Sequence, residues 1–434
     1  MKRLFLINDS TANKISYYHL LFLLASLPFD FFYSHVIIIS FAVHTIIQFK
    51  KQSVKAVFNL QTLLLMSVFL ITVLSTVYSP DKPAAFNEWG RQVTILLFPL
   101  LFALTSLDVK KYRQNLLLAF SMVCTLTVAY LYINVLYIIR FYHLPLSCLF
   151  SNHFSNHNFS DPIGMHATFF SLQVAIAFVF MISGFVQQPP GWYKGLYFIG
   201  MGILLAGLVQ LGAKSVIVCL FIIINLLVPL FLFEKNKRLK FMLVTGALSL
   251  FAMAFIISST AFRERFVAAL HTDLSRKIKY GDAVEPRLVR WEAAAGLITN
   301  SPVIGHGAGT EIGLLQDVFF NKKIYHAFLD KLNIHSQYLS FLIKSGIIGL
   351  AVYLATLFFG FKAAWQKRDL LFFSFMLLVA LVSVSENLLD VDKGVMFYAL
   401  FFSFFAFSSD GTRAGGMHNL LNGVATKQQI VTSL

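Results

Sequence analysis

Long apolar runs separated by short polar turns recur along almost the whole chain. A helix that crosses a bilayer needs roughly 17–25 predominantly apolar residues, and twelve stretches approach that length. We predict that they form transmembrane helices over residues 16–30, 32–48, 59–78, 90–106, 115–139, 163–185, 195–211, 215–233, 241–258, 336–360, 370–386 and 394–408. The pattern therefore predicts an all-α polytopic membrane protein, with residues 1–434 as a single integral-membrane domain.

Two of the polar segments between these spans are much longer than a turn. Residues 140–162 are rich in Asn, Ser and His, and residues 259–335 form the largest segment. Two helical pieces are predicted in the latter, from Ala261 to Leu270 and from Pro286 to Thr299, since proline is favoured in a first helical turn. Long loops with their own secondary structure are usually functional, so we expect residues 259–335 to carry catalytic elements.

Composition and charge add an orientation to this topology. The chain is 57% hydrophobic and 13% charged, against about 45–50% and about 25% in soluble domains. Nineteen Lys and Arg residues lie in the loops of one side and only five in the short loops of the other. The positive-inside rule places the basic side, both termini and a tail at residues 409–434 in the cytoplasm. This bias also accounts for the net charge of +15, so no nucleic-acid partner is predicted.

Three cations are predicted on the outer face, where the loops are otherwise poor in charge. Lys214 lies in a tight turn just before a helix N-terminus, a place that favours anions. Arg287 and Arg290 are three residues apart on one helical face, and arginine suits bidentate phosphate contacts. The alternatives are that Lys214 only extends to the membrane interface and that the two arginines form a solvated or lipid-contacting face. Together the three predict an anionic substrate.

A second group of outer-face residues suits proton transfer or orientation. His335 immediately precedes a predicted span, and histidine titrates near neutral pH, as a general base requires; simple helix capping is the alternative. Glu386 lies at the end of another span, where a carboxylate tends to be paired or functional, and it is expected to orient Arg or His or to form a structural salt bridge. His166 and Gln337 are further candidates for sugar contact or orientation.

No metal site or disulfide framework is predicted. His143, His153, His157, Asp161 and His166 gather in and beside the 140–162 segment, but they form no tight ligand motif. Sugar contacts or ordinary loop roles are favoured for them. Only three cysteines are present, with no CxxC pair. We therefore expect no metal and no cofactor.

In their order and spacing, several short motifs resemble the O-antigen ligase/polymerase superfamily of integral-membrane glycosyltransferases. The resemblance covers roughly residues 200–400. It is carried by Arg287–Leu288 with Trp291, by the turn Ser301–Pro302–Val303–Ile304–Gly305–His306–Gly307, and by His335–Ser336–Gln337–Tyr338–Leu339 before Gly346–Ile347–Ile348–Gly349. Two positions depart from the family pattern: Ala213–Lys214 stands where Ser–Arg is usual, and Ser336 where Asn is usual.

The resemblance implies a glycan donor carried on undecaprenyl diphosphate at the periplasmic face of a bacterial inner membrane. Lys214 and Arg287, with Arg290, would hold the diphosphate, and His335 would deprotonate an acceptor sugar hydroxyl that attacks the anomeric carbon with inversion. His335 and Arg287 are thus the implied catalytic residues, with no metal or cofactor. The implied partners are the lipid-linked glycan, lipid A–core or another glycan acceptor, and membrane lipids.

Three alternatives stay open at this point. Within the family, twelve spans and one large late loop favour a ligase that transfers glycan to lipid A–core over a polymerase that extends the lipid-linked chain. A transporter or lipid flippase is the alternative from another class; it is disfavoured because the predicted spans are almost free of charge, Lys344 being the exception. A scaffold or sensor without chemistry is the third.

Overall fold

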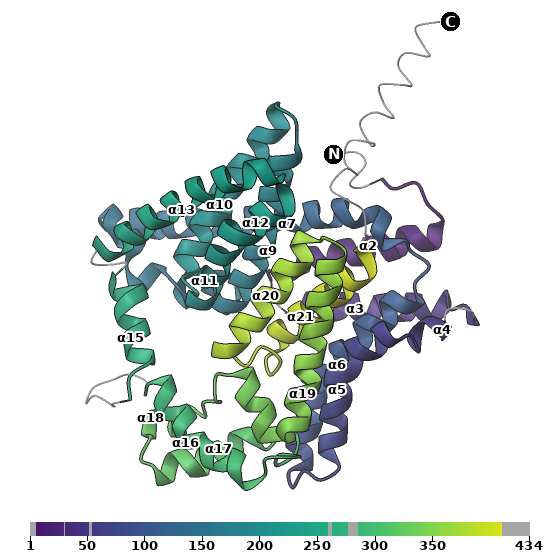
Figure 1. Ribbon diagram of the computed structural model, residues 1–434, viewed down its shortest axis with the longest axis vertical. Coiled ribbons are helices and arrows are strands. Elements are labelled where there is room, and N and C mark those ends of the chain that lie inside the picture. Colours follow the sequence, from purple (N-terminus) through teal and green to yellow (C-terminus); the bar gives the residue numbers. More distant parts are fainter. Residues whose placement is uncertain (1–5, 30, 52–53, 259–262, 277–284, 410–434) are drawn as a thin grey trace, which may run out of the picture.

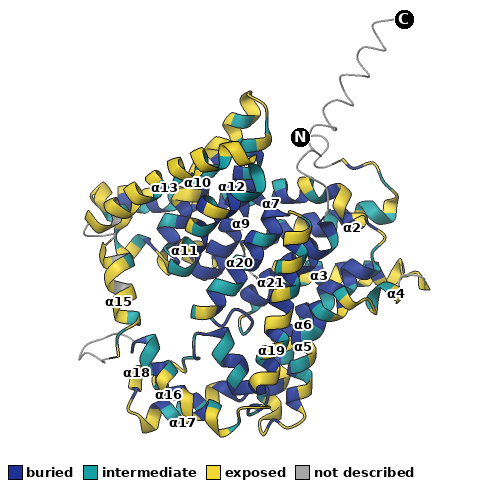
Figure 2. Cartoon of the chain, viewed as in Figure 1, coloured by how far each residue is buried: buried dark blue, intermediate teal, exposed yellow. Residues whose placement is uncertain are grey.

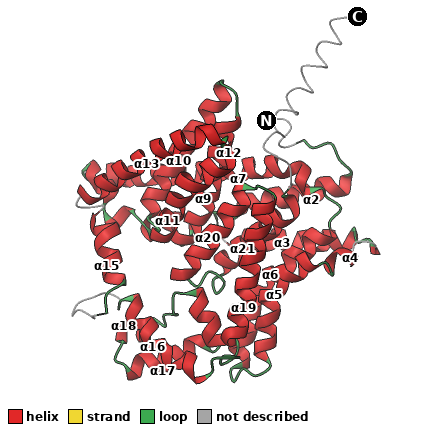
Figure 3. Ribbon diagram, in the orientation of Figure 1, coloured by secondary structure: helices red, strands yellow, loops and turns green. Residues whose placement is uncertain are grey.

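The computed structural model describes residues 6–29, 31–51, 54–258, 263–276 and 285–409. Within these residues the chain consists of helices and loops, with no strand (Figure 3). Most helices pack side by side in one bundle (Figure 1). The bundle helices are α2 (Thr11–Ser26), α3 (Phe31–Ile47), α5 (Leu60–Thr76), α6 (Lys82–Leu104), α7 (Val109–Phe141), α9 (Ala167–Gln187), α10 (Trp192–Leu211), α11 (Lys214–Ile222), α12 (Val228–Leu232), α13 (Lys235–Ser258), α19 (Gln337–Gln366), α20 (Leu370–Ser385) and α21 (Asp392–Ser408).

Each of the twelve predicted spans coincides with a helix of this bundle. Five helical segments are long and apolar enough to cross a membrane: α7, α9, α10, α11 through α12, and α19. The fourth of these, α11 through α12, is continuous across a π-helical stretch, Ile223–Leu227. Three shorter helices, α3, α5 and α20, are also strongly apolar. The all-helical, multi-pass character is confirmed, whereas the count of twelve spans stays a prediction.

Three helices form the centre of the bundle. Nearly every residue of α9 and α21, and most of α20, is buried (Figure 2). A helix that is apolar all round is expected in such a position. Aromatic rings join the centre, as where Phe375 of α20 packs against Phe401 and Phe405 of α21. By contrast α10 and α13 expose large apolar side chains such as Phe198 and Leu243, as surfaces that face lipid do.

The first and last described parts of the chain lie at one end of the bundle. Tyr112, near the start of α7, donates a hydrogen bond of 2.7 Å to Asp9. Its neighbour Arg113 forms an ion pair of 2.6 Å with Asp369, just before α20, and the Ser409 hydroxyl donates to the same carboxylate. The helix ends that carry the candidate site residues lie at the opposite end, as the predicted alternation of spans requires.

The segment after α13 folds into short helices with a small core of their own, below α20 in Figure 1. Leu297, Leu315 and Phe319 are among the buried residues of this core. The helix predicted from Pro286 to Thr299 is confirmed as α16, and the described part of the piece from Ala261 to Leu270 is helical; residues 259–262 and 277–284 lie outside the described residues. The segment's described helical elements are α15 (Ala269–Asp273), preceded by a π-helical turn (Glu264–Ala268), α16 (Arg287–Asn300), α17 (Glu311–Asn321) and α18 (Tyr325–Leu329).

The glycine-rich turn at residues 301–309 docks into a break in α19. Gly346 interrupts that helix with φ +61°. The break frees backbone groups, and the turn satisfies them: the N–H groups of His306 and Gly307 donate to the carbonyls of Ile343 and Lys344, each at 2.8 Å. In return the Ile347 N–H donates to Pro302 at 2.9 Å. Since buried backbone groups need partners, the turn and the break depend on each other.

Replacing Gly305 with alanine is expected to destabilise the fold by at least about 1–3 kcal/mol, the usual cost of a strained backbone position. Gly305 has φ +69°, and an added Cβ would lie 2.5 Å from the carbonyl carbon of Lys344. The midpoint of thermal unfolding in detergent measures the effect.

Gly296 provides the matched control for this substitution. It lies inside α16, and an added Cβ there would meet nothing within 4 Å. Gly296→Ala should leave the midpoint unchanged or raise it, since alanine is favoured over glycine in a helix by roughly 0.5–1 kcal/mol. Equal midpoints for Gly305→Ala and Gly296→Ala would contradict the described docking.

Candidate functional site

Glu386 brings together two of the residues that the sequence singles out. It directly follows the last residue of α20, and its carboxylate contacts both His335 and Arg287. Its Oε2 lies 3.3 Å from Nδ1 of His335, and its Oε1 lies 3.3 Å from Nη2 of Arg287. Arg287 also donates through Nη1 to the carbonyl of Ser385 at 2.6 Å. Glu386 therefore contacts an arginine and a histidine of the long segment, and whether it orients them or forms a structural salt bridge stays a prediction.

The charge state of Glu386 follows from these neighbours. Burial by itself raises the pKa of the carboxyl, but the hydrogen bond with His335 and the positive charge of Arg287 outweigh it, and the pKa is lower than usual. An ionised Glu386 accepts the hydrogen on Nδ1 of His335. Nε2 of the imidazole is then a free acceptor, because it has no hydrogen-bond partner among the described residues. A carboxylate that fixes a histidine in this way prepares it to act as a base.

The backbone of His335 is held from both sides. Its φ of +49° is in the left-handed region, which costs energy for a residue other than glycine. On one side the Ile334 N–H donates to Glu311 at 3.1 Å, and on the other the Ser336 N–H donates to the side-chain oxygen of Asn387 at 2.7 Å. Asn387 also donates to Glu311, at 3.0 Å. These bonds hold the imidazole against Glu386.

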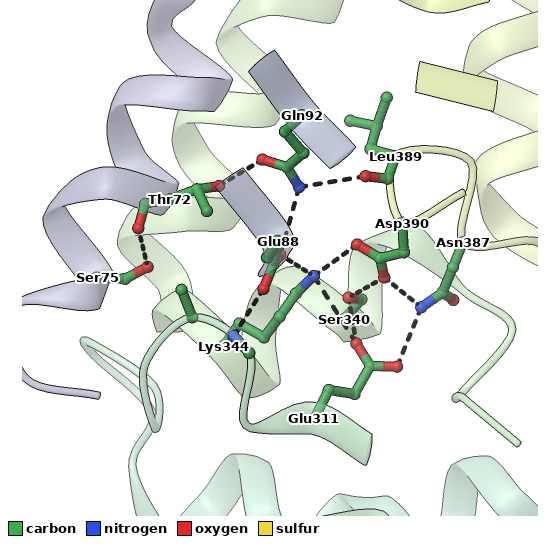
Figure 4. Close-up of polar contacts among 12 residues, drawn as sticks. Thr72, Ser75, Glu88, Gln92, Glu311, Ser340, Lys344, Asn387, Leu389 and Asp390 are labelled. Carbon is green, nitrogen blue, oxygen red and sulfur yellow. Dashed lines mark hydrogen bonds and ion pairs between the residues drawn. The ribbon is translucent and has the colours of Figure 1, made fainter. Parts of the chain in front are cut away.

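Glu311, which accepts the Ile334 N–H, also belongs to a buried charge cluster (Figure 4). Lys344 of α19 is 5% exposed and places Nζ 2.6 Å from Glu88 and 2.7 Å from Asp390. Glu311 is 4.0 Å from the same nitrogen, and the Ser340 hydroxyl donates to its carboxylate. The cluster thus joins α6, α17, α19 and the loop after α20.

The cluster holds three carboxyl groups for one lysine. Burial, and then the charge of Asp390, raise the pKa of Glu311. Burial also acts on Asp390, but the adjacent Lys344 holds the pKa of Asp390 below its usual range. Burial and the charge of Asp390 therefore favour the protonated form of Glu311 more than water would.

Arg290 is a buried cation without a direct partner. Arg290 is 3% exposed. Its Nε and Nη1 atoms have no hydrogen-bond partner among the described residues. Burial, followed by repulsion from Arg287, lowers its pKa to about 10, so it remains charged at neutral pH. An unpaired buried cation is costly, and an anionic ligand would offset that cost.

Lys214 forms an ion pair with Asp273. It is the first residue of α11, as the predicted position at a helix start requires, and its Nζ lies 2.9 Å from the Asp273 carboxylate. The same carboxylate contributes to the electrostatics of Arg290. No direct contact joins Lys214 to Arg287, Arg290 or His335 in the described residues. The structure therefore brings Arg287 and His335 together on Glu386 (the Glu386 group) and pairs Lys214 with Asp273 instead.

His166 is the N-cap residue of α9, and the charges of Glu386 and Arg287 act on its ring. Its ring accepts the Thr168 N–H as a helix cap, and its centroid lies 4.1 Å from that of His157. Removal from water and the neighbouring His157 lower the pKa of His166 to about 4, although part of the residue stays exposed. Both rings are therefore neutral near pH 7. Among the described residues, no group of three His, Cys, Asp or Glu side chains is arranged to hold a metal ion.

The Gln337 side chain is buried and bonded to a neighbouring loop, so it is not open to a substrate. It is fully buried, and its side-chain oxygen accepts the Leu389 N–H at 2.7 Å. The bond ties the start of α19 to the loop that carries Glu386. Of the two roles predicted for Gln337, sugar contact or orientation, this geometry fits orientation.

Part of the chain matches a known protein family. Residues 167–354 match the family model described as O-Antigen ligase. The match supports the resemblance of this chain to the O-antigen ligase/polymerase superfamily. No match was found among curated proteins.

The O-antigen ligase match covers under half of the chain but contains most of the candidate site. Lys214, Arg287, Arg290 and His335 all lie inside residues 167–354. Glu386 lies outside the matched residues, yet it contacts both Arg287 and His335. The match supports a function of the O-antigen ligase or polymerase type, and that family implies a lipid-linked glycan and a glycan acceptor as substrates in a membrane.

Two acidic residues of the site escaped the sequence analysis. Glu88 and Glu311 each stand near a helix start, where a carboxylate is commonly a solvated or capping residue. Both are almost fully buried. The available signal was Lys344, since a lysine within an apolar span requires acidic partners.

Proposed function

We propose that this protein transfers a glycan from undecaprenyl diphosphate to a sugar hydroxyl of lipid A–core. The observation that carries the proposal is the contact of one carboxylate, Glu386, with both His335 and Arg287. It sets a general base beside a phosphate-binding cation, and these are the two groups that displacement of a diphosphate requires. The reaction needs no metal ion or cofactor.

The chemical step is a single displacement. Nε2 of His335 takes the proton from the acceptor hydroxyl while that oxygen forms a bond to the anomeric carbon. The bond from this carbon to the diphosphate oxygen breaks, and its electron pair leaves with undecaprenyl diphosphate. Attack opposite the leaving group inverts the anomeric configuration. Glu386 stabilises the imidazolium that forms, as the acidic member of a catalytic triad does.

The side chains of Arg287 and Arg290 bind the diphosphate leaving group. Arg287 is 25% exposed at its side chain, and the buried, unpartnered Arg290 lies one helical turn further along α16. Preorganised cations in a site with little water stabilise developing negative charge strongly. Lys214 would join them when a phosphate replaces Asp273 as its partner.

The orientation follows from the charge bias of the loops. The bundle end that holds Asp9 and Ser409 carries the basic loops, so it faces the cytoplasm under the positive-inside rule. The Glu386 group lies at the other end, in the periplasm. An active site on this face requires an acceptor that is exposed at the outer leaflet.

Replacing Arg290 with methionine is expected to lower the rate of transfer by about 10²–10³-fold, the usual effect of losing one electrostatic contact to a leaving group. The thermal midpoint should stay equal or rise, because the buried cation lacks a partner in the absence of substrate. Initial rates and thermal unfolding measure the two effects. A large fall in both would contradict a role in anion binding and indicate a structural one.

Purified protein supplied with an undecaprenyl-diphosphate-linked oligosaccharide, lipid A–core and EDTA tests the proposal. Glycan that appears on lipid A–core supports the ligase. A ladder on the undecaprenyl carrier indicates a polymerase of the same superfamily. Failure to form either product, with folded wild-type protein, contradicts the proposal and favours a transporter.

A further inference from the structure

A cavity of about 360 Å³ includes the candidate residue Lys214 in its lining. The asparagine-rich stretch at residues 152–158 contributes most of the other lining residues, and Gly212 and Glu264 complete the lining. Small-molecule sites have volumes of about 300–1,000 Å³. The Glu386 group does not line this cavity.

The asparagine-rich wall is held in place from α10. Gln210 is buried and donates to the carbonyls of Leu149 and Phe154, at 2.7 and 2.6 Å. Its own backbone carbonyl accepts the Asn156 N–H at 3.0 Å. Asn156 has φ +57°, a conformation that asparagine adopts more readily than most residues. The wall is thus a fixed surface, a property that recognition of a particular ligand requires.

The polar groups on this wall suit an uncharged, hydroxyl-rich ligand. The side-chain amides of Asn152 and Asn156 make no hydrogen bond to the described residues. A carboxamide both donates and accepts, so it matches sugar hydroxyls, which do the same. His157 also lines the cavity, and burial lowers its pKa, which makes it a neutral partner near pH 7.

Two contacts connect the cavity to the groups that handle the donor. Lys214, proposed above to hold phosphate, is itself a lining residue. His157 packs against His166, and the charge of Glu386 acts on both rings. A ligand in the cavity would therefore lie next to the diphosphate and close to the reaction centre.

We propose that this cavity binds the sugar that is attached directly to the diphosphate of the donor. Asn152, Asn156 and His157 would contact its hydroxyls while Lys214 contacts the adjoining phosphate. The inference rests on the proposed glycan transfer and adds to it a site that selects the donor's first sugar. The donor is favoured over the acceptor because a phosphate-binding residue lines the same cavity.

The double variant Asn152→Ala/Asn156→Gly tests this assignment. Glycine keeps the left-handed backbone at position 156 while removing the amide. The KM for the lipid-linked donor should rise about tenfold, in line with the loss of two neutral hydrogen bonds. The KM for lipid A–core, the rate at saturating donor and the thermal midpoint should not change.

His153→Ala is the matched control, since His153 lies in the same stretch but does not line the cavity. It should leave every constant unchanged. Wild-type transfer with an unchanged donor KM in the double variant would overturn the sugar site alone. A rise in acceptor KM instead would overturn the donor assignment, and absence of wild-type transfer would overturn the proposed function as well.

Discussion

The His335→Asn variant is expected to transfer glycan about 10²–10⁴ times more slowly than the wild type, the usual cost of removing a general base. Asparagine is the informative replacement because residue 335 has φ +49°, and asparagine tolerates that conformation better than alanine does. The fold should therefore persist. Initial rates at saturating donor measure the loss, and the thermal midpoint checks the fold.

A companion variant separates the base from the residue that positions it. Glu386→Gln removes the anion beside His335 while keeping a side chain of the same size. The rate at saturating substrate should fall while the thermal midpoint stays close to that of the wild type, because the imidazole loses the carboxylate that orients it. A purely structural role for Glu386 would lower the midpoint together with the rate.

His326→Asn is the matched control for His335→Asn. His326 lies in α18 of the same extramembrane segment, is exposed, and contacts none of the candidate site residues through its side chain. Its replacement should leave the rate unchanged. Near-normal transfer by His335→Asn would contradict the assignment of the base, whatever the control gives.

Loss of the Lys344 charge is expected to destabilise the protein by about 3–5 kcal/mol, as when one partner of a buried ion pair is removed. Lys344→Met keeps the length of the side chain but leaves Glu88 and Asp390 without their direct counter-ion, at contacts that are now 2.6 and 2.7 Å. A large fall in the thermal midpoint is expected. Transfer should fall as well, because Glu311 of the cluster accepts hydrogen bonds from the Ile334 N–H and from Asn387, which hold the backbone of His335.

A second substitution checks that charge is the cause. Adding Asp390→Asn to Lys344→Met removes one uncompensated carboxylate and should recover part of the lost midpoint. Lys322→Met, at an exposed position after α17, provides the control and should have little effect. If Lys344→Met is as stable as Lys322→Met, the described charge cluster is wrong.

The fold was largely predictable because the bilayer imposes long apolar helices. Span positions follow from apolar length alone, and the helix at Pro286–Thr299 was marked by its proline and its breaker. The break in α19 was not predicted, since Gly346 looks like any small residue in a span. Its left-handed conformation depends on contact with a turn some 40 residues earlier in the chain.

The site was predictable where a residue interrupts an apolar pattern, and less so where the partner is distant. His335 and Glu386 stand at the edges of predicted spans, and Arg287 stands at the start of a predicted helix in the long outer segment, so each could be singled out alone. The pairing of Lys214 with Asp273 and the isolation of Arg290 are tertiary facts. No spacing in the sequence indicates which carboxylate meets which cation, because the contacts join separate helices.

The most direct test of the central claim is the release of undecaprenyl diphosphate during transfer in proteoliposomes. One carrier should be released for each glycan transferred, only when acceptor is present, and at a rate reduced at least a hundredfold in His335→Asn. This holds for a ligase and for a polymerase alike. Absence of carrier release by folded wild-type protein, or equal release by His335→Asn, would contradict a His335-based displacement at the diphosphate.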